Sequence, residues 1–218
     1  MIGVFNAGRL LLATLARYAR TFTTDQIAGG GKMSDKIPRL EFEDLDPDLA
    51  KVLEPRVERL GYLGEFFKCM AHQPAALLSF YEFTENSKKG LPKRLVELIA
   101  LSISTKVGND YERNQHERLS VRLGFGREWV SAVETLDPDG AEGLSESERV
   151  VQRLVIAMVD RFGHGVEAEL DAALDEIGHV RTVGVMMVVG RYVTHGLFVN
   201  ALALKPPVPS IFEDGFNG

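Results

Sequence analysis

Three ionisable residues fall where the sequence otherwise predicts a hydrophobic core. Glu97 interrupts the apolar run from Leu95 to Ile103, and Glu112 and His116 lie four residues apart in the next segment. A helix that is apolar on nearly every face is normally buried, so the Glu97 carboxylate is expected in or beside the interior. Coupled carboxylates and imidazoles have displaced pKa values, which general acid/base chemistry uses. The three residues therefore indicate a site for proton transfer.

Two helices joined by a tight turn, within Leu91 to Gly124, are expected to position these residues. Pro92 suits the first helical position, where its missing N–H costs nothing. Gly108 is expected to end the first helix, and Asn109 or Asp110 to cap the second.

In the second helix, Glu112 and His116 share one stripe with Leu119 and Leu123. Residues at this spacing lie on one face of a helix. Because the two leucines are expected to face the core, the carboxylate and the imidazole are carried inward with them.

Each of the three residues also has a purely structural interpretation. Glu112 could be only the carboxylate of a capping box, and His116 could be a hydrogen-bonded core histidine. Glu97 could instead reach Lys93 or Arg94 at the surface. The trio together favours the chemical interpretation more than any one member does.

The chain is predicted to be all-α, an antiparallel bundle of about eight helices, because no segment shows sustained period-two alternation. Val183 to Val189 is the most strand-like segment, but its continuation at helical spacing favours a buried helix. Helices are expected at about 47–60, 63–72, 74–89, 92–107, 110–123, 126–134, 146–162, 166–177 and 179–204.

The central hairpin resembles the carboxymuconolactone decarboxylase and alkyl hydroperoxidase (AhpD-like) family. The resemblance rests on Glu97, Gly108, Tyr111-Glu112, His116 and Gly124, on Met70 to Pro74 upstream, and more loosely on Tyr192 and Asn200 to Leu202 downstream. It covers roughly Leu40 to Lys205. Since members of this family are typically trimers or hexamers, the resemblance implies a homo-oligomer.

One departure from the family pattern excludes a cysteine-based peroxidase mechanism at this site. The peroxidase branch carries a Cys-x-x-Cys pair where this chain has Asn109 and Glu112. The thiolate is the reacting species in that mechanism, and neither Asn nor Glu can replace it. The single cysteine, Cys69, lies in an apolar segment and is expected to be a buried, inert thiol.

The resemblance then implies a lyase of the carboxy-lyase class that acts without a cofactor or metal on a small organic acid or lactone. His116 is expected to donate the proton, with Glu97 and Glu112 setting its tautomer and pKa. Side chains expected to bind the substrate are Tyr111, His72, Tyr192, Arg191 and His195. Phe80 and Tyr81 are expected in the core or in the wall of an apolar pocket.

Three alternatives stay open at this stage. The fold could be a catalytically silent ligand-binding or structural oligomer, or an alkyl hydroperoxidase-like (peroxiredoxin-type) protein without its cysteine pair. His116, Glu112, Glu97 and His195 could instead form a carboxylate-rich metal site.

Composition narrows the class of protein and its partners. The 218 residues are 45% hydrophobic and 26% charged, with a formal net charge of −6. These values are typical of a soluble globular protein, and the acidic balance argues against nucleic acid as a partner. The predicted setting is cytoplasmic, without a membrane.

The N-terminal segment differs from the rest of the chain. Residues 1–32 contain Arg9, Arg17, Arg20 and Lys32 against Asp25, and their apolar residues could form one face of a helix. They are predicted to be a flexible or presequence-like extension, with organelle targeting as an alternative. Residues 33–218 are predicted to form a single AhpD-like domain.

Overall fold

Helices make up the part of the chain that the computed structural model describes, residues 37–213 and 215–216. After a 3₁₀ turn, η3 (Phe42–Asp44), the helices are α2 (Pro47–Leu60), α3 (Glu65–Met70), α4 (Pro74–Lys88), α5 (Lys93–Lys106), α6 (Asp110–Arg122), α7 (Arg127–Glu134), α8 (Glu146–Arg161) and α9 (Glu167–Ala201). No strand occurs among these residues, so the all-α prediction is confirmed. The predicted extension over residues 1–32 lies outside them.

Local sequence signals set the helix ends. The Asp46 side chain accepts from the backbone of α2, and Asn109 accepts from the Glu112 N–H to cap α6. Ser145 and Glu148 form a reciprocal capping box at the start of α8. Pro92 precedes α5 as its N-cap residue rather than opening the helix. These caps satisfy backbone groups that a helix end leaves unpaired.

The last two predicted helices are one long element with a kink. Helix α9 bends at Gly178, whose φ of 76° and ψ of 162° are not helical. A side chain is strongly disfavoured at those angles, so glycine permits the bend. The bend separates a short N-terminal arm from the segment that carries Arg191, Tyr192 and His195.

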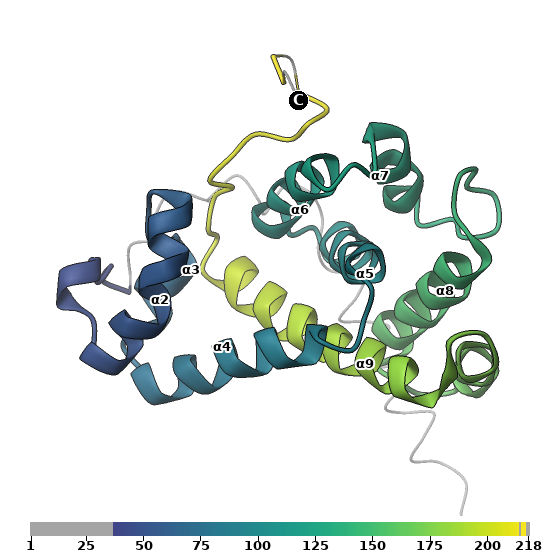
Figure 1. The fold of residues 1–218 in the computed structure, drawn as a ribbon, viewed down its shortest axis with the longest axis horizontal. Helices are drawn as coiled ribbons and strands as arrows, with labels where there is room; N and C mark the ends of the chain where they lie inside the picture. Colours follow the sequence, from purple (N-terminus) through teal and green to yellow (C-terminus); the bar gives the residue numbers. More distant parts are fainter. Residues whose placement is uncertain (1–36, 214, 217–218) are drawn as a thin grey trace, which may run out of the picture. The chain divides into compact units, whose positions relative to one another are not determined.

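Helix α5 is the centre of the larger hydrophobic core. It packs against α6, α7, α8 and α9, and Figure 1 shows it nearly end-on inside that ring. Leu98, Ile99 and Leu101 on α5 are fully buried. This enclosure explains why α5 is apolar on almost every face.

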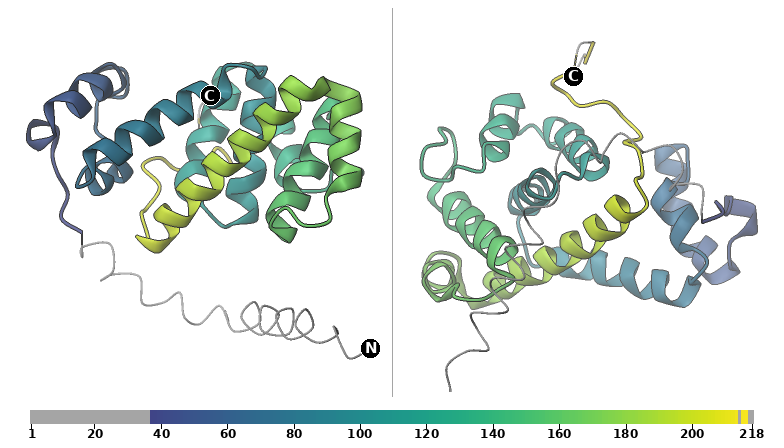
Figure 2. Two further views of the ribbon diagram at one scale, coloured as in Figure 1. Left: turned by 90° about the horizontal axis from the view of Figure 1, so that it is seen from below. Right: turned by 180° about the vertical axis from the view of Figure 1, so that it is seen from behind.

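A second, smaller core involves α2, α3 and α4. Leu49, Leu53 and Phe66 form its centre, and Tyr111 of α6 and Val199 of α9 join it. Figure 2 shows α4 meeting α9, and this contact connects the layer to the rest together with those of Tyr111 and Val199. Residues from both cores therefore meet along α6 and α9.

Within the described residues, α9 is the one helix long and apolar enough to cross a membrane by length and composition. Half of its most apolar 18-residue window is buried inside the protein itself. A core helix shows the same pattern, and the buried residues of α9 include Arg191 and His195.

Two glycines of α9 should respond oppositely to alanine. Gly178→Ala is expected to lower the free energy of unfolding by about 1–3 kcal/mol, because a side chain is forced into a glycine-only conformation. Gly190→Ala should raise it by about 0.5–1 kcal/mol, since Gly190 is helical and a Cβ there meets nothing within 4 Å. Denaturant unfolding at low protein concentration measures both. Equal changes in the free energy of unfolding for the two substitutions would contradict the non-helical conformation at Gly178.

Candidate active site

A histidine held between two carboxylates lies at the α5–α6 hairpin. His116 Nδ1 lies 2.7 Å from Glu97 Oε2 on α5, and its Nε2 lies 2.9 Å from Glu112 Oε2 one turn earlier on α6. Both carboxylates are buried, and the imidazole is 11% exposed. The predicted trio is therefore brought together, and the surface pairing of Glu97 with Lys93 or Arg94 is not what the structure has.

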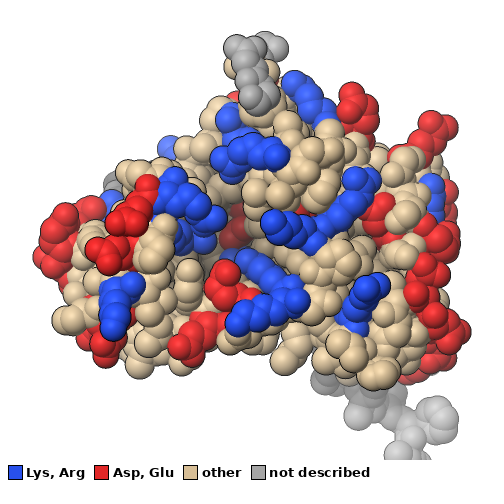
Figure 3. All heavy atoms as spheres, in the orientation of Figure 1, with Lys and Arg blue, Asp and Glu red and all other residues tan. Residues whose placement is uncertain are grey.

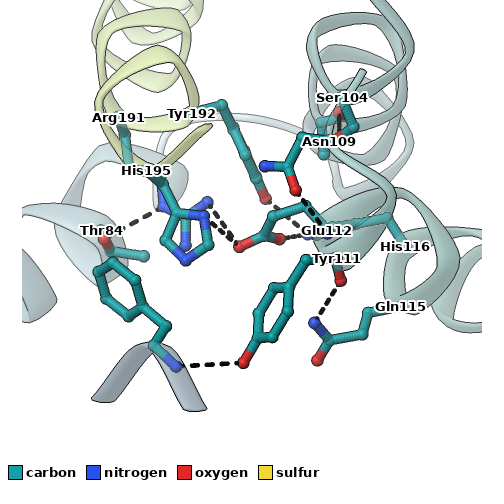
Figure 4. Close-up of polar contacts among 12 residues, drawn as sticks. Thr84, Ser104, Asn109, Tyr111, Glu112, Gln115, His116, Arg191, Tyr192 and His195 are labelled. Carbon is teal, nitrogen blue, oxygen red and sulfur yellow. Dashed lines mark hydrogen bonds and ion pairs between the residues drawn. The ribbon is translucent and has the colours of Figure 1, made fainter. Parts of the chain in front are cut away.

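Helix α9 adds three polar side chains on one face, as Figure 4 shows. The Tyr192 hydroxyl lies 3.1 Å from His116 Nε2. His195 Nδ1 and Arg191 Nη1 lie 3.0 and 3.5 Å from Glu112 Oε1. All three α9 residues were predicted as substrate-binding residues, and all three reach the acid/base trio.

Neighbouring groups orient Arg191 within this buried cluster. Its Nε donates to the hydroxyl of Thr84 on α4 at 3.3 Å, and its guanidinium lies 4.1 Å from the centre of the Tyr192 ring. A buried guanidinium needs such partners because desolvating an unpaired charge is costly. Arg191 thus places a fixed positive charge beside Glu112.

The environment separates the pKa values of the two histidines. Burial opposes protonation of His116, but the Glu97 and Glu112 carboxylates outweigh it and raise its pKa to about 9. Burial also lowers the pKa of His195, with Glu112 acting in the opposite direction. His116 is therefore protonated at neutral pH, whereas the pKa of His195 lies below its ordinary value.

The Glu112 carboxyl is ionised although it is fully buried. Burial alone would raise its pKa, but the positive field of His195 and Arg191 and the hydrogen bond from His116 hold that pKa well below its usual range. The Tyr192 hydroxyl behaves oppositely, because burial raises its pKa well above the ordinary value. It stays a neutral phenol that can donate a hydrogen bond.

A cavity of about 370 Å³ opens onto His116 and Glu112. Its lining includes His116, Glu112 and Arg191, together with four aromatic side chains and four further basic ones. The aromatic residues are Phe66, Phe67, Phe80 and Tyr81, and the basic ones are Arg56, Arg59, Lys88 and Arg122. Figure 3 shows Lys and Arg side chains gathered around a hollow on this face. The cavity suits an anion with a flat apolar body.

Of the five predicted substrate-binding residues, only Arg191 lines the cavity, whereas His195 lines a small recess and Tyr192 lines neither space. The Tyr111 hydroxyl accepts from the Phe66 N–H at 3.4 Å and lines the same recess, which also contacts Glu112 and Arg191. His72 Nε2 lies 2.8 Å from the Pro38 carbonyl and lines neither space. Its part in substrate binding has no structural support.

The buried face of α6 differs from the predicted apolar stripe. Leu119 and Leu123 are only half-buried, and Leu119 lines the cavity. The deeply buried side chains are polar instead, and Glu117 accepts from the Ser210 hydroxyl and the Ile211 N–H. The expectation that the leucines face the core is therefore wrong, because the C-terminal segment supplies partners for polar groups there.

Several cavity residues could not be found from sequence. The four basic residues Arg56, Arg59, Lys88 and Arg122 come from α2, α4 and α6. The sequence indicated only that Phe80 and Tyr81 could form the wall of a pocket. Arg56 and Arg59 share one side of α2 at i, i+3 spacing, a pattern common on any solvated helix. Such arginines can be assigned to a binding site only when the structure shows that they line a cavity.

The described residues contain no group of three or more His, Cys, Asp or Glu side chains placed to hold a metal ion. Cys69 is buried, and this burial raises the pKa of its thiol, although Arg39 acts in the opposite direction. Such a thiol is poorly nucleophilic.

Two solved structures share this fold. One is a protein of unknown function from Agrobacterium tumefaciens, suggested to be an antioxidant defence protein AhpD, with a TM-score of 0.60 and 18% identity over 64% of this chain and 96% of that one. The other is a cysteine-to-alanine variant of the debrominase Bmp8 in complex with 2,3,4-tribromopyrrole, with a TM-score of 0.66 and 17% identity over 78% of this chain and 90% of that one. No family model matches the chain, and no curated protein matches it. At these identities the likeness shows the fold alone.

The two carboxylates predict how His116 titrates. In the parent protein the His116 ring should titrate near pH 9, and in Glu97→Gln its pKa should fall toward 6.5 because one carboxylate is gone. NMR of the histidine ring resonances over the pH range checks this. A His116 that titrates near 6.5 in both proteins would contradict the coupling.

The raised pKa of His116 also makes the stability of the folded protein depend on pH. Because folding raises the pKa of His116, its contribution is fully present below about pH 6.5 and is lost as pH rises through about 9. The loss should be on the order of 3 kcal/mol in the parent protein and smaller in Glu97→Gln. Parallel denaturant titrations at pH 6.5 and pH 10 measure it.

Proposed function

We propose that this chain, which has the AhpD-like helical fold, is a cofactor-free enzyme that decarboxylates a small organic acid or lactone, or performs a related proton transfer. The observation that carries the proposal is His116, held between Glu97 and Glu112 on the wall of a basic cavity. Such chemistry requires a protonated side chain beside the carboxylate of the bound substrate.

Each member of the trio has a distinct part in the proposed step. Decarboxylation leaves a carbanion or enolate, which a nearby acid must protonate. His116, with a pKa of about 9, carries that proton at neutral pH. Ionised Glu112 cannot donate one, so Glu112 and Glu97 act by fixing the two ring nitrogens.

Arg191 would hold the substrate, and Tyr192 would position His116. The Arg191 guanidinium lies beside Glu112 on the cavity wall and can pair with a substrate carboxylate. The neutral Tyr192 hydroxyl lies 3.1 Å from His116 Nε2 and lines neither the cavity nor the recess, so it would act through the imidazole. Tyr111 and His195 would act behind them, by keeping Glu112 and the floor of the recess in place.

A silent binding protein of the same fold is the second candidate. Both ring nitrogens of His116 already lie within hydrogen-bond distance of carboxylates, so the histidine is satisfied without any substrate. In that case the cavity would bind the same anions and leave them unchanged. An alkyl hydroperoxidase-like origin without the cysteine pair fits either candidate, since Cys69 is buried and its thiol pKa is raised.

We also propose that the chain associates with a second copy of itself through α9. The exposed apolar residues Val180, Val183, Met187 and Leu197 occupy heptad positions along one side of α9. The two heptad positions between Met187 and Leu197 are Gly190 and Thr194. An exposed apolar stripe of this length marks an interaction surface. The opposite side of the helix packs inside the protein through Arg191 and His195. Because two copies of the chain present the same stripe, the stripe of one copy can pack against that of the other.

Removing the proton donor should abolish turnover. His116→Asn is expected to lower the rate of CO₂ release from a panel of carboxylated lactones and oxo acids by about 10²–10⁴-fold, the usual contribution of general acid catalysis. His164→Asn is the matched control and should keep the parent rate. Binding of a panel member without turnover by the parent protein would favour the silent candidate instead.

Charge on the α9 stripe should disrupt self-association. Val183→Glu combined with Leu197→Glu should lower the sedimenting mass, because desolvating two carboxylates in an apolar contact is costly. Lys51→Glu on exposed α2 is the control and should sediment as the parent does. A monomeric parent protein, or a monomer that instead co-sediments with lipid vesicles, would overturn the contact.

A further inference from the structure

Lys88 is a nucleophile-bearing residue of the cavity that the proton-transfer step leaves unused. It is the last residue of α4, and its side chain lines the same cavity as His116, Glu112 and Arg191. The side chain is 29% exposed, and its Nζ lies 3.7 Å from Glu85 Oε1. The amine is therefore largely enclosed yet open to a molecule in the cavity.

The surroundings of Lys88 lower the pKa of its amine. Burial lowers this pKa, the positive field of Arg191 lowers it further, and Glu85, Glu112 and Glu97 act in the opposite direction. The other charged groups on the cavity wall are Arg56, Arg59, Arg122 and the protonated His116, all of which are positive. A lysine desolvated beside another cation is the arrangement that activates an amine toward carbonyl groups.

We propose that Lys88 is a catalytic nucleophile that forms an imine with the ketone carbon of a 3-oxo acid bound in this cavity. This rests on the proposed function and names its substrate class. The class follows from the cavity, because its lining includes arginines that can pair with a carboxylate and the rings of Phe66, Phe67 and Phe80, on which an apolar part can pack. It also follows from the chemistry, since the enzyme proposed above has no cofactor to accept an electron pair.

The decarboxylation through an imine needs only the side chains of the cavity, protons and water. The neutral amine attacks the carbonyl carbon, and the carbinolamine takes up one proton and loses water to leave a positively charged imine. The C–C bond to the carboxylate then breaks, CO₂ leaves, and its electron pair forms an enamine with the nitrogen. His116 protonates the enamine carbon, and water hydrolyses the imine to release the ketone and free Lys88.

Lys89 provides a matched control one residue away. It is exposed, and its Nζ donates to Asn86 Oδ1 at 2.7 Å on the outside of the helix end. It does not line the cavity. Any difference between Lys88 and Lys89 in reaction with a carbonyl compound therefore reports the cavity rather than lysine chemistry in general.

The test is reductive trapping on the full chain with acetoacetate or oxaloacetate and cyanoborohydride. Peptide mass mapping of the parent protein should find Lys88 modified at least tenfold faster than Lys89, with the ratio largest at the lower end of the pH range. Lys88→Met should remove the adduct, and Lys89→Met should leave it. Uniform modification of the lysines, or an adduct that survives in Lys88→Met, overturns the proposal.

His116→Asn distinguishes this proposal from the proton-transfer proposal. Imine formation needs only the amine, so the variant should still be trapped at Lys88 while its release of CO₂ falls. Full CO₂ release by Lys88→Met, together with loss in His116→Asn, would overturn the imine and leave the acid/base site standing. Trapping at Lys88 with unchanged turnover in His116→Asn would overturn the acid/base site alone.

Discussion

The burial of two carboxylates on adjoining helices is the constraint on which the site depends. Glu97 and Glu112 lie in a region where an unpaired charge costs several kcal/mol. His116 bridges them through its two ring nitrogens, and Arg191 and His195 contact the remaining Glu112 oxygen. Removing one of these partners takes away part of the compensation for a buried charge. The same contacts therefore hold α9 against the α5–α6 hairpin and set the protonation of the cluster.

This electrostatic arrangement has a consequence for ligand choice. Arg191 and His195 of α9 compensate Glu112, and His116 compensates Glu97. The cavity beside them is lined by Arg56, Arg59, Lys88 and Arg122. A ligand therefore meets a basic wall with a protonated imidazole at its base. An anion is attracted to such a wall, and the aromatic side chains of α3 and α4 favour one with an unsaturated or apolar body.

The sequence predicted most of the local structure because helix signals are local. Asn109 caps α6 as expected, and Asp46 and the Ser145–Glu148 box provide equally local caps for α2 and α8. The apolar run of α5 correctly indicated a central helix. The α6 stripe was wrong in part, since a hydrophobic pattern does not reveal that Ser210 and Ile211 return to satisfy Glu117. Residues 93 apart in the chain make that contact.

By itself, the sequence determined the all-α fold, the hairpin, and the grouping of Glu97, Glu112 and His116, because residues four apart on one helix and residues on adjoining helices are constrained by helical geometry. Only the tertiary structure decided that Arg191, Tyr192 and His195 close the trio, that His72 lies elsewhere, and that Lys88 opens onto the cavity. Those placements depend on how α4 and α9 pack across the α5–α6 pair. That packing is a property of the whole core, which no local pattern encodes.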